Sequence, residues 1–218
     1  MSILYKQFTV PLSEQNLARD MRDLVASDLG LSADDILELE ILKKSLDARK
    51  KSQIFHHYQL RLVTRDDETL LRTNADKLEN FEEKARYHPT NDIDFKGKSF
   101  RHPPVIIGSG PAGTFAALVL AELGQKCIVV ERGEAVEDRM RTVHRLQRSG
   151  SFSEESNYCY GEGGAGTFSD GKLTCGRNHP LIRYLFEQWV RFGAPDSILY
   201  EAHPHIGTDY LMQIARKT

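Results

Sequence analysis

The sequence predicts an α/β fold in which a small α+β domain precedes a Rossmann-type βαβ unit. Three observations predict it. The first part of the chain alternates strand and helix patterns, and a polar stretch follows at residues 88–103. Directly after that stretch, a short apolar run leads into a glycine motif and a helix. We therefore expect a ferredoxin-like domain at 1–87, a linker at 88–103, and a Rossmann-type domain at 104–218.

In the first domain, the segment "ILYKQFTVPL" is expected to form an edge strand. A helix capped by Ser13 follows, and its apolar face is given by the helical spacing of Leu17, Met21, Leu24 and Leu29. Two strands come next, "ILELEIL" and "IFHHYQLRLV", and a second helix is expected over "NADKLENFEEKAR". Strand, helix, strand, strand and helix is the order of a ferredoxin-like split unit whose last strand is unassigned.

A basic stretch, "KKSLDARKKSQ", lies between the two central strands of this domain. One interpretation is a solvated hairpin tip, which is common for short charged runs at turns. The alternative is a hairpin, 43–51, that binds a partner. On that interpretation the protein is a nucleotide-sensing binding protein whose ferredoxin-like domain contacts RNA or another protein.

Composition restricts the classes of function. The 218 residues hold 29 Lys and Arg against 31 Asp and Glu, so the basic excess of a nucleic-acid-binding protein is absent and nucleic acid is not an expected partner. Apolar runs are too short for a membrane span, and "MSILYKQFTV" does not resemble a signal peptide. The 3 cysteines form no metal-ligand pattern. An odd cysteine count without an export signal indicates a reducing compartment, and we expect a cytoplasmic protein.

The glycine motif begins the second domain. Val105, Ile106 and Ile107 predict a buried parallel strand, and Gly108-x-Gly110-x-x-Gly113 follows at once. The first glycine permits a tight turn, the second lets the backbone approach a pyrophosphate, and the third lets the helix pack against the strand. A second strand, "CIVVE", ends in Glu131, whose carboxylate can accept hydrogen bonds from a ribose.

This arrangement predicts a dinucleotide site, and its glycine spacing suits NAD or FAD. The neighbouring Arg132 keeps NADP open as well.

A second glycine-rich segment, "GEGGAGTFSDGKLTCG", comes close to a phosphate-binding loop of the G-x-x-x-x-G-K-[ST] type. Such a loop requires a buried strand before it and a Ser or Thr after the lysine, and here Leu173 follows Lys172. We expect instead that its backbone N–H groups, with Thr167, Ser169 and Lys172, form an anion-binding nest close to the same nucleotide. The alternative is a flexible surface loop.

Several strings carry a resemblance to a known family. "GSGPAG" followed by "ERG" resembles the FAD-binding entry of glutathione-reductase-type flavoproteins. The longer set "EDRMRTVHRLQRSG", "GEGGAGTFSDGKL", "GAP" and "PHIGTD" resembles the FAD-dependent dehydrogenases that are also called NAD(FAD)-utilising dehydrogenases. The resemblance covers most of the chain, including the N-terminal domain.

The resemblance implies FAD as the cofactor and NAD(P)H as an electron donor. It implies two groups of FAD-binding residues. The first comprises Gly108, Ser109, Gly110, Pro111, Ala112, Gly113, Glu131 and Arg132. The second, near the flavin, comprises Gly164, Gly166, Thr167, Phe168, Ser169, Asp170 and Lys172.

The expected function is that of an FAD-dependent oxidoreductase in which the flavin carries a hydride between a nicotinamide cofactor and a small-molecule substrate. No side chain is assigned a catalytic role, and the substrate, the donor and the oligomeric state stay open. Members of the family are much longer than this chain, so we expect an incomplete flavoprotein fold that stops in a substrate-domain insertion. His205 and Asp209 form either an acid–base pair or a polar loop before a helix.

Overall fold

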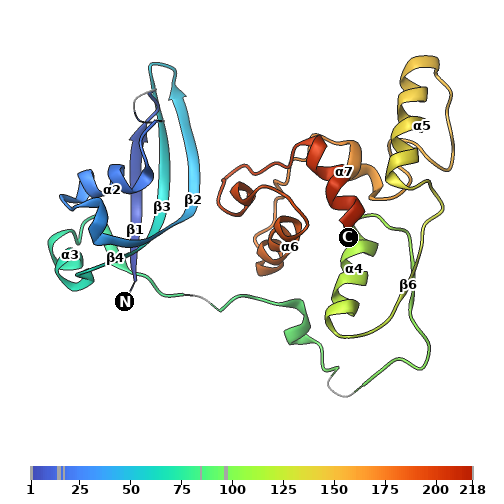
Figure 1. The fold of residues 1–218 in the computed structure, drawn as a ribbon, viewed down its shortest axis with the longest axis horizontal. Coiled ribbons are helices and arrows are strands. Elements are labelled where there is room, and N and C mark those ends of the chain that lie inside the picture. The colour runs from blue at the N-terminus through green and yellow to red at the C-terminus, as the bar shows by residue number, and fades with distance from the viewer. Residues whose placement is uncertain (1, 14–15, 17, 84, 96–97, 218) are drawn as a thin grey trace. The chain divides into compact units, whose positions relative to one another are not determined.

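The computed structural model describes residues 2–13, 16, 18–83, 85–95 and 98–217. The chain divides into two compact units (Figure 1). Unit 1 contains residues 1–85 together with 199–203, and unit 2 contains 86–198 together with 204–218. Each unit is described here by itself.

In the part of the chain that the structure describes, unit 1 is an antiparallel sheet with the α-helices α2 and α3 and the short 3-10 helix η1. Its strands lie in the order β2-β3-β1-β4, and β1 is paired on both sides. The expectation that the first strand lies at an edge is therefore wrong, because a short strand far along the chain returns to pair beside it. The elements in chain order are β1 (Ile3–Pro11), α2 (Met21–Leu29), η1 (Ala33–Asp35), β2 (Ile36–Lys50), β3 (Gln53–Thr64), α3 (Asp67–Thr73) and β4 (Leu78–Asn80).

The core of unit 1 follows the alternation of its strands. Tyr58, Leu60 and Leu62 of β3 are buried together, because every second residue of a strand points to the same face. Helix α2 covers this face with Val25 and Leu29.

Helix α2 begins later than the apolar spacing predicts. Asp20 caps it, because its carboxylate accepts a hydrogen bond from the Arg22 N–H, and Gly30 ends it in the left-handed conformation. Residues 14, 15 and Leu17, which were expected to belong to the helix, lie outside the described residues.

The sequence pattern predicts the second helix of unit 1 at the wrong position. The structure has α3 seven residues earlier, at Asp67–Thr73, where the Asp66 carboxylate accepts a hydrogen bond from the Thr69 N–H. Leu78, expected on that helix, instead begins β4 and is only 2% exposed. Burial against β1 overrides the helical spacing of the "NADKLENFEEKAR" segment, and β4 is the strand that the sequence left unassigned.

The basic stretch between β2 and β3 is mostly strand. Strand β2 continues to Lys50 and β3 begins at Gln53, so that only Lys51 and Ser52 form the turn. Its charged side chains therefore extend along one edge of the sheet and are not concentrated at a tip.

In the described residues, unit 2 contains the βαβ unit, three further α-helices and three short 3-10 helices. Strands β5 (Val105–Ile107) and β6 (Ile128–Val130) pair in parallel, and the helix between them is α4 (Pro111–Glu122). The elements outside this βαβ unit are η2 (Pro89–Asp92), α5 (Val136–Ser149), η3 (Gly164–Phe168), α6 (Pro180–Arg191), η4 (Asp196–Leu199) and α7 (Thr208–Lys217).

The strands of the βαβ unit are not buried, contrary to the sequence expectation. Val105 is 56% exposed and Ile107 is 80% exposed, and all three residues of β6 are exposed as well. A parallel strand is buried only when helices cover both faces and strands flank both edges, and the described residues form only two strands here. Among the described residues, no helix combines the length and the apolar character that crossing a membrane requires.

Candidate functional site: a glycine turn beneath a second glycine loop

The turn between β5 and α4 depends on two of its glycines. Gly108 has φ +92°, a conformation that side chains disfavour, and its N–H donates to the Val130 carbonyl at 2.7 Å. A Cβ on Gly113 would lie 1.9 Å from the Gly108 carbonyl oxygen. The two positions therefore need glycine for different reasons, the first for its conformation and the second for close packing of helix against strand.

The turn leads into an open helix N-terminus. Gly110 is the N-cap of α4 and Pro111 the first helical residue, and no side chain caps this end. The first N–H groups of a helix have no intrahelical partner, and the helix dipole is positive there. Ala112 and Gly113 supply such N–H groups, so this end of α4 has the chemistry of a pyrophosphate site.

Glu131 stabilises the same turn through hydrogen bonds. One of its carboxylate oxygens accepts hydrogen bonds from the Ser109 N–H at 2.8 Å and the Ser109 hydroxyl at 3.0 Å, and the other accepts from the Gly133 N–H at 2.9 Å. Partial burial opposes ionisation, yet these hydrogen bonds outweigh it and lower the pKa of Glu131 below its usual value. The Arg132 N–H contributes to the lowered pKa as well, so a ribose hydroxyl that binds this carboxylate shares an oxygen with these donors or displaces one of them.

The second glycine loop lies directly against the turn. The Gly163 N–H donates to the Ser109 carbonyl at 3.1 Å. A Cβ on Gly164 would lie 3.1 Å from the Gly110 Cα and 3.2 Å from the Pro111 Cδ. A side chain at position 164 would press on Gly110 and Pro111, so the loop lies this close to the turn because Gly164 has none.

The other residues expected near the flavin are arranged differently. Thr167 is buried and donates to the Glu162 carbonyl at 3.3 Å, while Phe168 packs edge-on against Tyr158. Lys172 forms an exposed ion pair with Asp170 at 2.7 Å, and no described contact connects this pair with the glycine turn.

Three more of the predicted residues either contact neighbouring residues or have open space around them. The Ser169 hydroxyl donates to the Gly166 carbonyl at 2.8 Å, and a Cβ on Gly166 would meet no atom within 4 Å. The Arg132 guanidinium stacks 4.7 Å from the centre of the Tyr160 ring.

Arg139 is the important residue that the sequence reasoning missed. It is fully buried in α5, and its guanidinium donates to four backbone carbonyls of one loop. The acceptors are Asn157 at 3.0 Å, Tyr158 at 3.1 Å, Gly161 at 3.3 Å and Glu162 at 2.6 Å.

No described carboxylate pairs with the Arg139 guanidinium, and the Phe168 ring lies 4.9 Å from it. Burial lowers the pKa of Arg139 below its usual value, although the nearby charge of Glu131 favours the charged form. Arg139 thus fixes the segment that leads into Gly163 and Gly164. The signal for it was the "EDRMR" string, whose arginines cannot be told apart without the fold.

A cavity of about 210 Å³ opens beside the turn. Its lining residues come from the glycine turn, α4, β6, the second glycine loop and α7. Its lining comprises Ser109, Thr114, Ala117, Val129, Glu162, Gly163 and Ala215. Its glycine, its two hydroxyl groups and its small side chains fit the close approach of a nucleotide.

His205 and Asp209 are not joined by any described contact. Strand-like pairing holds the His205 segment against Lys172, and Asp209 lines a separate cavity between α5 and α7. The pairing requires glycine at position 171, because a Cβ there would lie 1.7 Å from the Ile206 carbonyl oxygen.

Comparisons with known proteins agree with a nucleotide site at the glycine turn. Residues 104–141 match the family model described as "FAD binding domain", and residues 3–63 match "Domain of unknown function (DUF8436)". An uncharacterized protein of Clostridium beijerinckii is 39% identical over 192 residues, which are 88% of this chain and 36% of that protein. The chain therefore spans about a third of the length of this relative. The match to the FAD-binding family model supports a relationship to FAD-dependent oxidoreductases over the βαβ unit.

Proposed function

We propose that unit 2 binds the adenosine diphosphate part of FAD and that the protein is a flavin-dependent oxidoreductase. The observation that carries the proposal is the contact of the second glycine loop with the Gly108–Gly113 turn, within a segment that matches an FAD-binding family. The pyrophosphate would bind the N–H groups at the start of α4. The ribose would bind the Glu131 carboxylate, in place of one of its present donors or beside it.

FAD, when bound, supplies the hydride-transfer chemistry. The residues of this chain bind and orient it: the turn and the loop exclude side chains from the pyrophosphate region, and Arg139 holds the loop in place. A nicotinamide cofactor as donor and a small-molecule acceptor complete the proposed reaction.

Unit 1 is proposed to be a ferredoxin-like domain. Its strand order, β2-β3-β1-β4, with every neighbouring pair antiparallel and one helix after β1 and another after β3, supports that assignment.

Flavin selectivity tests the proposed site. We expect FAD and ADP to compete for one site, measured by fluorescence of added FAD, and FMN not to compete, because FMN lacks the adenosine diphosphate part. Gly164→Val should weaken FAD binding by tenfold or more, roughly 1.4 kcal/mol, because its side chain would press on Gly110 and Pro111.

Gly176→Val is the matched control. Gly176 lies at the end of the same glycine-rich segment, with open space around it and a backbone that tolerates a side chain. Equal affinity for FMN and FAD, or equal loss in both variants, would contradict the proposed site.

A further inference from the structure

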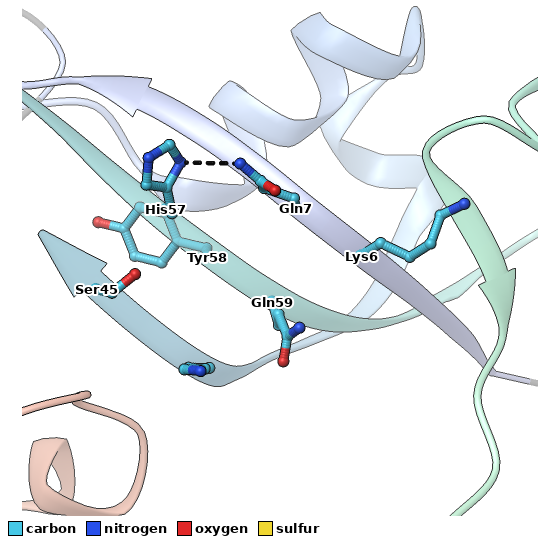
Figure 2. A pocket seen from close by; sticks show the side chains of 7 residues that line it. Lys6, Gln7, Ser45, His57, Tyr58 and Gln59 are labelled. Atoms are coloured by element: carbon cyan, nitrogen blue, oxygen red, sulfur yellow. Dashed lines mark hydrogen bonds between the residues drawn. The ribbon is translucent and has the colours of Figure 1, made fainter. Parts of the chain in front are cut away.

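A cavity of about 220 Å³ lies on the sheet of unit 1 (Figure 2). The strands β1, β2 and β3 all contribute to it. Its lining comprises Lys6, Gln7, Lys43, Ser45, His57, Tyr58 and Gln59.

Two β-bulges form this cavity at one level of the sheet. On β1, Tyr5 pairs with Leu60 and Phe8 with Tyr58, so that two residues, Lys6 and Gln7, stand opposite Gln59 alone. On the other side of β3, Ile41 pairs with Leu60 and Lys43 with Gln59, which leaves Leu42 as an extra residue in β2.

Both neighbours of β3 are therefore interrupted beside the same residue, Gln59. Bulges redirect side chains and are frequent next to functional sites. The β2–β3 pairing has two other register shifts, but only at Gln59 is the pairing of β3 interrupted on both sides.

The cavity is lined by hydrogen-bond donors and by no carboxylate. Lys43, Gln59 and Ser45 offer an ammonium, an amide and a hydroxyl. The Gln7 amide nitrogen lies 3.4 Å from the His57 Nδ1, the interaction drawn in Figure 2, and the Lys6 ammonium donates to the Ala75 carbonyl at 3.3 Å. Among the described residues, no carboxylate forms an ion pair with Lys43.

Carboxylates elsewhere in β2 have partners of their own. Arg61 pairs with Glu38 at 3.0 Å and with Glu40 at 3.8 Å. The Asp47 carboxylate accepts from Arg49 and lies 3.6 Å from His57. These pairs leave the positive charge of Lys43 available to a ligand.

We propose that this cavity binds the phosphate group of a small molecule, with Lys43 as the charged contact and the side chains of Gln59 and Ser45 as neutral donors. An oxyanion accepts several hydrogen bonds at once, and a charge-assisted contact supplies most of the affinity. The site is independent of FAD, since every lining residue belongs to unit 1.

Titration of the full chain with inorganic phosphate tests the proposal, followed by NMR of the side-chain amide groups of glutamine. The signals of Gln7 and Gln59 should shift and saturate. Lys43→Met should weaken binding by roughly tenfold, because a hydrogen bond to a charged group is lost. Lys50→Met is the matched control: this lysine lies on the same strand but does not line the cavity, and its loss should leave the affinity unchanged.

Shifts at Gln59 that stay linear in phosphate concentration would overturn the proposal, as would an equal loss in both lysine variants. The proposal would also be overturned if the signals saturated with an RNA oligonucleotide but not with phosphate. That result would indicate a polymer as the ligand. None of these results depends on FAD, so the test stands apart from the assignment of unit 2.

Discussion

The sheet of unit 1 and the βαβ unit of unit 2 hold their shapes by different means. Among its described residues, unit 1 gathers 13 buried apolar ones into one cluster, so side-chain burial stabilises it. The β5 and β6 strands contribute no buried residue, and the glycine turn between them is fixed by backbone hydrogen bonds and close backbone contacts. The shape of the candidate site therefore depends on the absence of side chains, whereas the stability of unit 1 depends on their burial.

The sharpest way to break the turn is Gly113→Val. The new side chain would begin 1.9 Å from the Gly108 carbonyl oxygen, which neither α4 nor β5 can avoid without separating. We expect unit 2 to lose at least about 4 kcal/mol of unfolding free energy. The fluorescence of Trp189, the 1 tryptophan of the chain and part of unit 2, reports its denaturant unfolding. An unchanged midpoint would show that the turn is not packed as described.

In unit 1, Leu60→Ala tests dependence on side-chain burial. Leu60 is 0% exposed at the centre of the cluster, so its truncation should cost about 2–5 kcal/mol. Leu46→Ala, at a side chain 58% exposed, is the control and should change stability by less than about 0.5 kcal/mol. Far-UV circular dichroism during urea unfolding gives both values. Similar losses in the two variants would contradict the burial pattern.

Arg139→Met tests the buried guanidinium. Four carbonyls would lose their donor, and we expect unit 2 to lose about 3 kcal/mol, again followed by Trp189 fluorescence. Arg141→Met, on the exposed side of α5, removes only a surface pair with Asp138 and should have little effect. If both variants behaved alike, Arg139 would not be the residue that holds the loop.

The pH dependence of unit 2 should include a contribution from Glu131. Its folded pKa lies below the usual value of 4.5, so its stabilising effect is complete above about pH 4.5 and is lost as the pH falls through the folded pKa. Glu131→Gln should be less stable than the parent chain at neutral pH, and the difference should shrink in acid. A difference that stays constant with pH would show that the ionised carboxylate does not fasten the turn.

The smallest effect is expected at Ile107. Because its side chain is 80% exposed, Ile107→Ser should change the unfolding free energy of unit 2 by less than about 0.5 kcal/mol. The same chemical change at a buried isoleucine of unit 1, Ile3, should be severe. A large loss at Ile107 would mean that this strand is covered in solution, for example by a second copy of the chain.

The sequence predicts local features of the molecule better than distant ones. The Gly108–Gly113 spacing predicts the turn, α4 and β6, because their geometry depends on neighbours within about 25 residues. It does not predict that Glu131 binds Ser109 or that Arg139 binds four carbonyls. Those contacts depend on how α5 and the second loop fold back.

The errors in unit 1 have a similar origin. The segment around Leu78 has helical spacing, yet pairing with β1 makes it a strand. Burial of β5 and β6 was expected from their apolar composition alone, but burial requires further elements around them, which a local pattern does not supply.

The most direct test of the central claim is to purify the chain, add FAD, remove the excess, and record the visible spectrum before and after denaturation. We predict a flavin spectrum with one FAD released per chain, and no retained flavin in Gly113→Val. A chain that stays colourless after addition of FAD, while Trp189 fluorescence shows unit 2 to be folded, would contradict the assignment of the glycine turn as an FAD site.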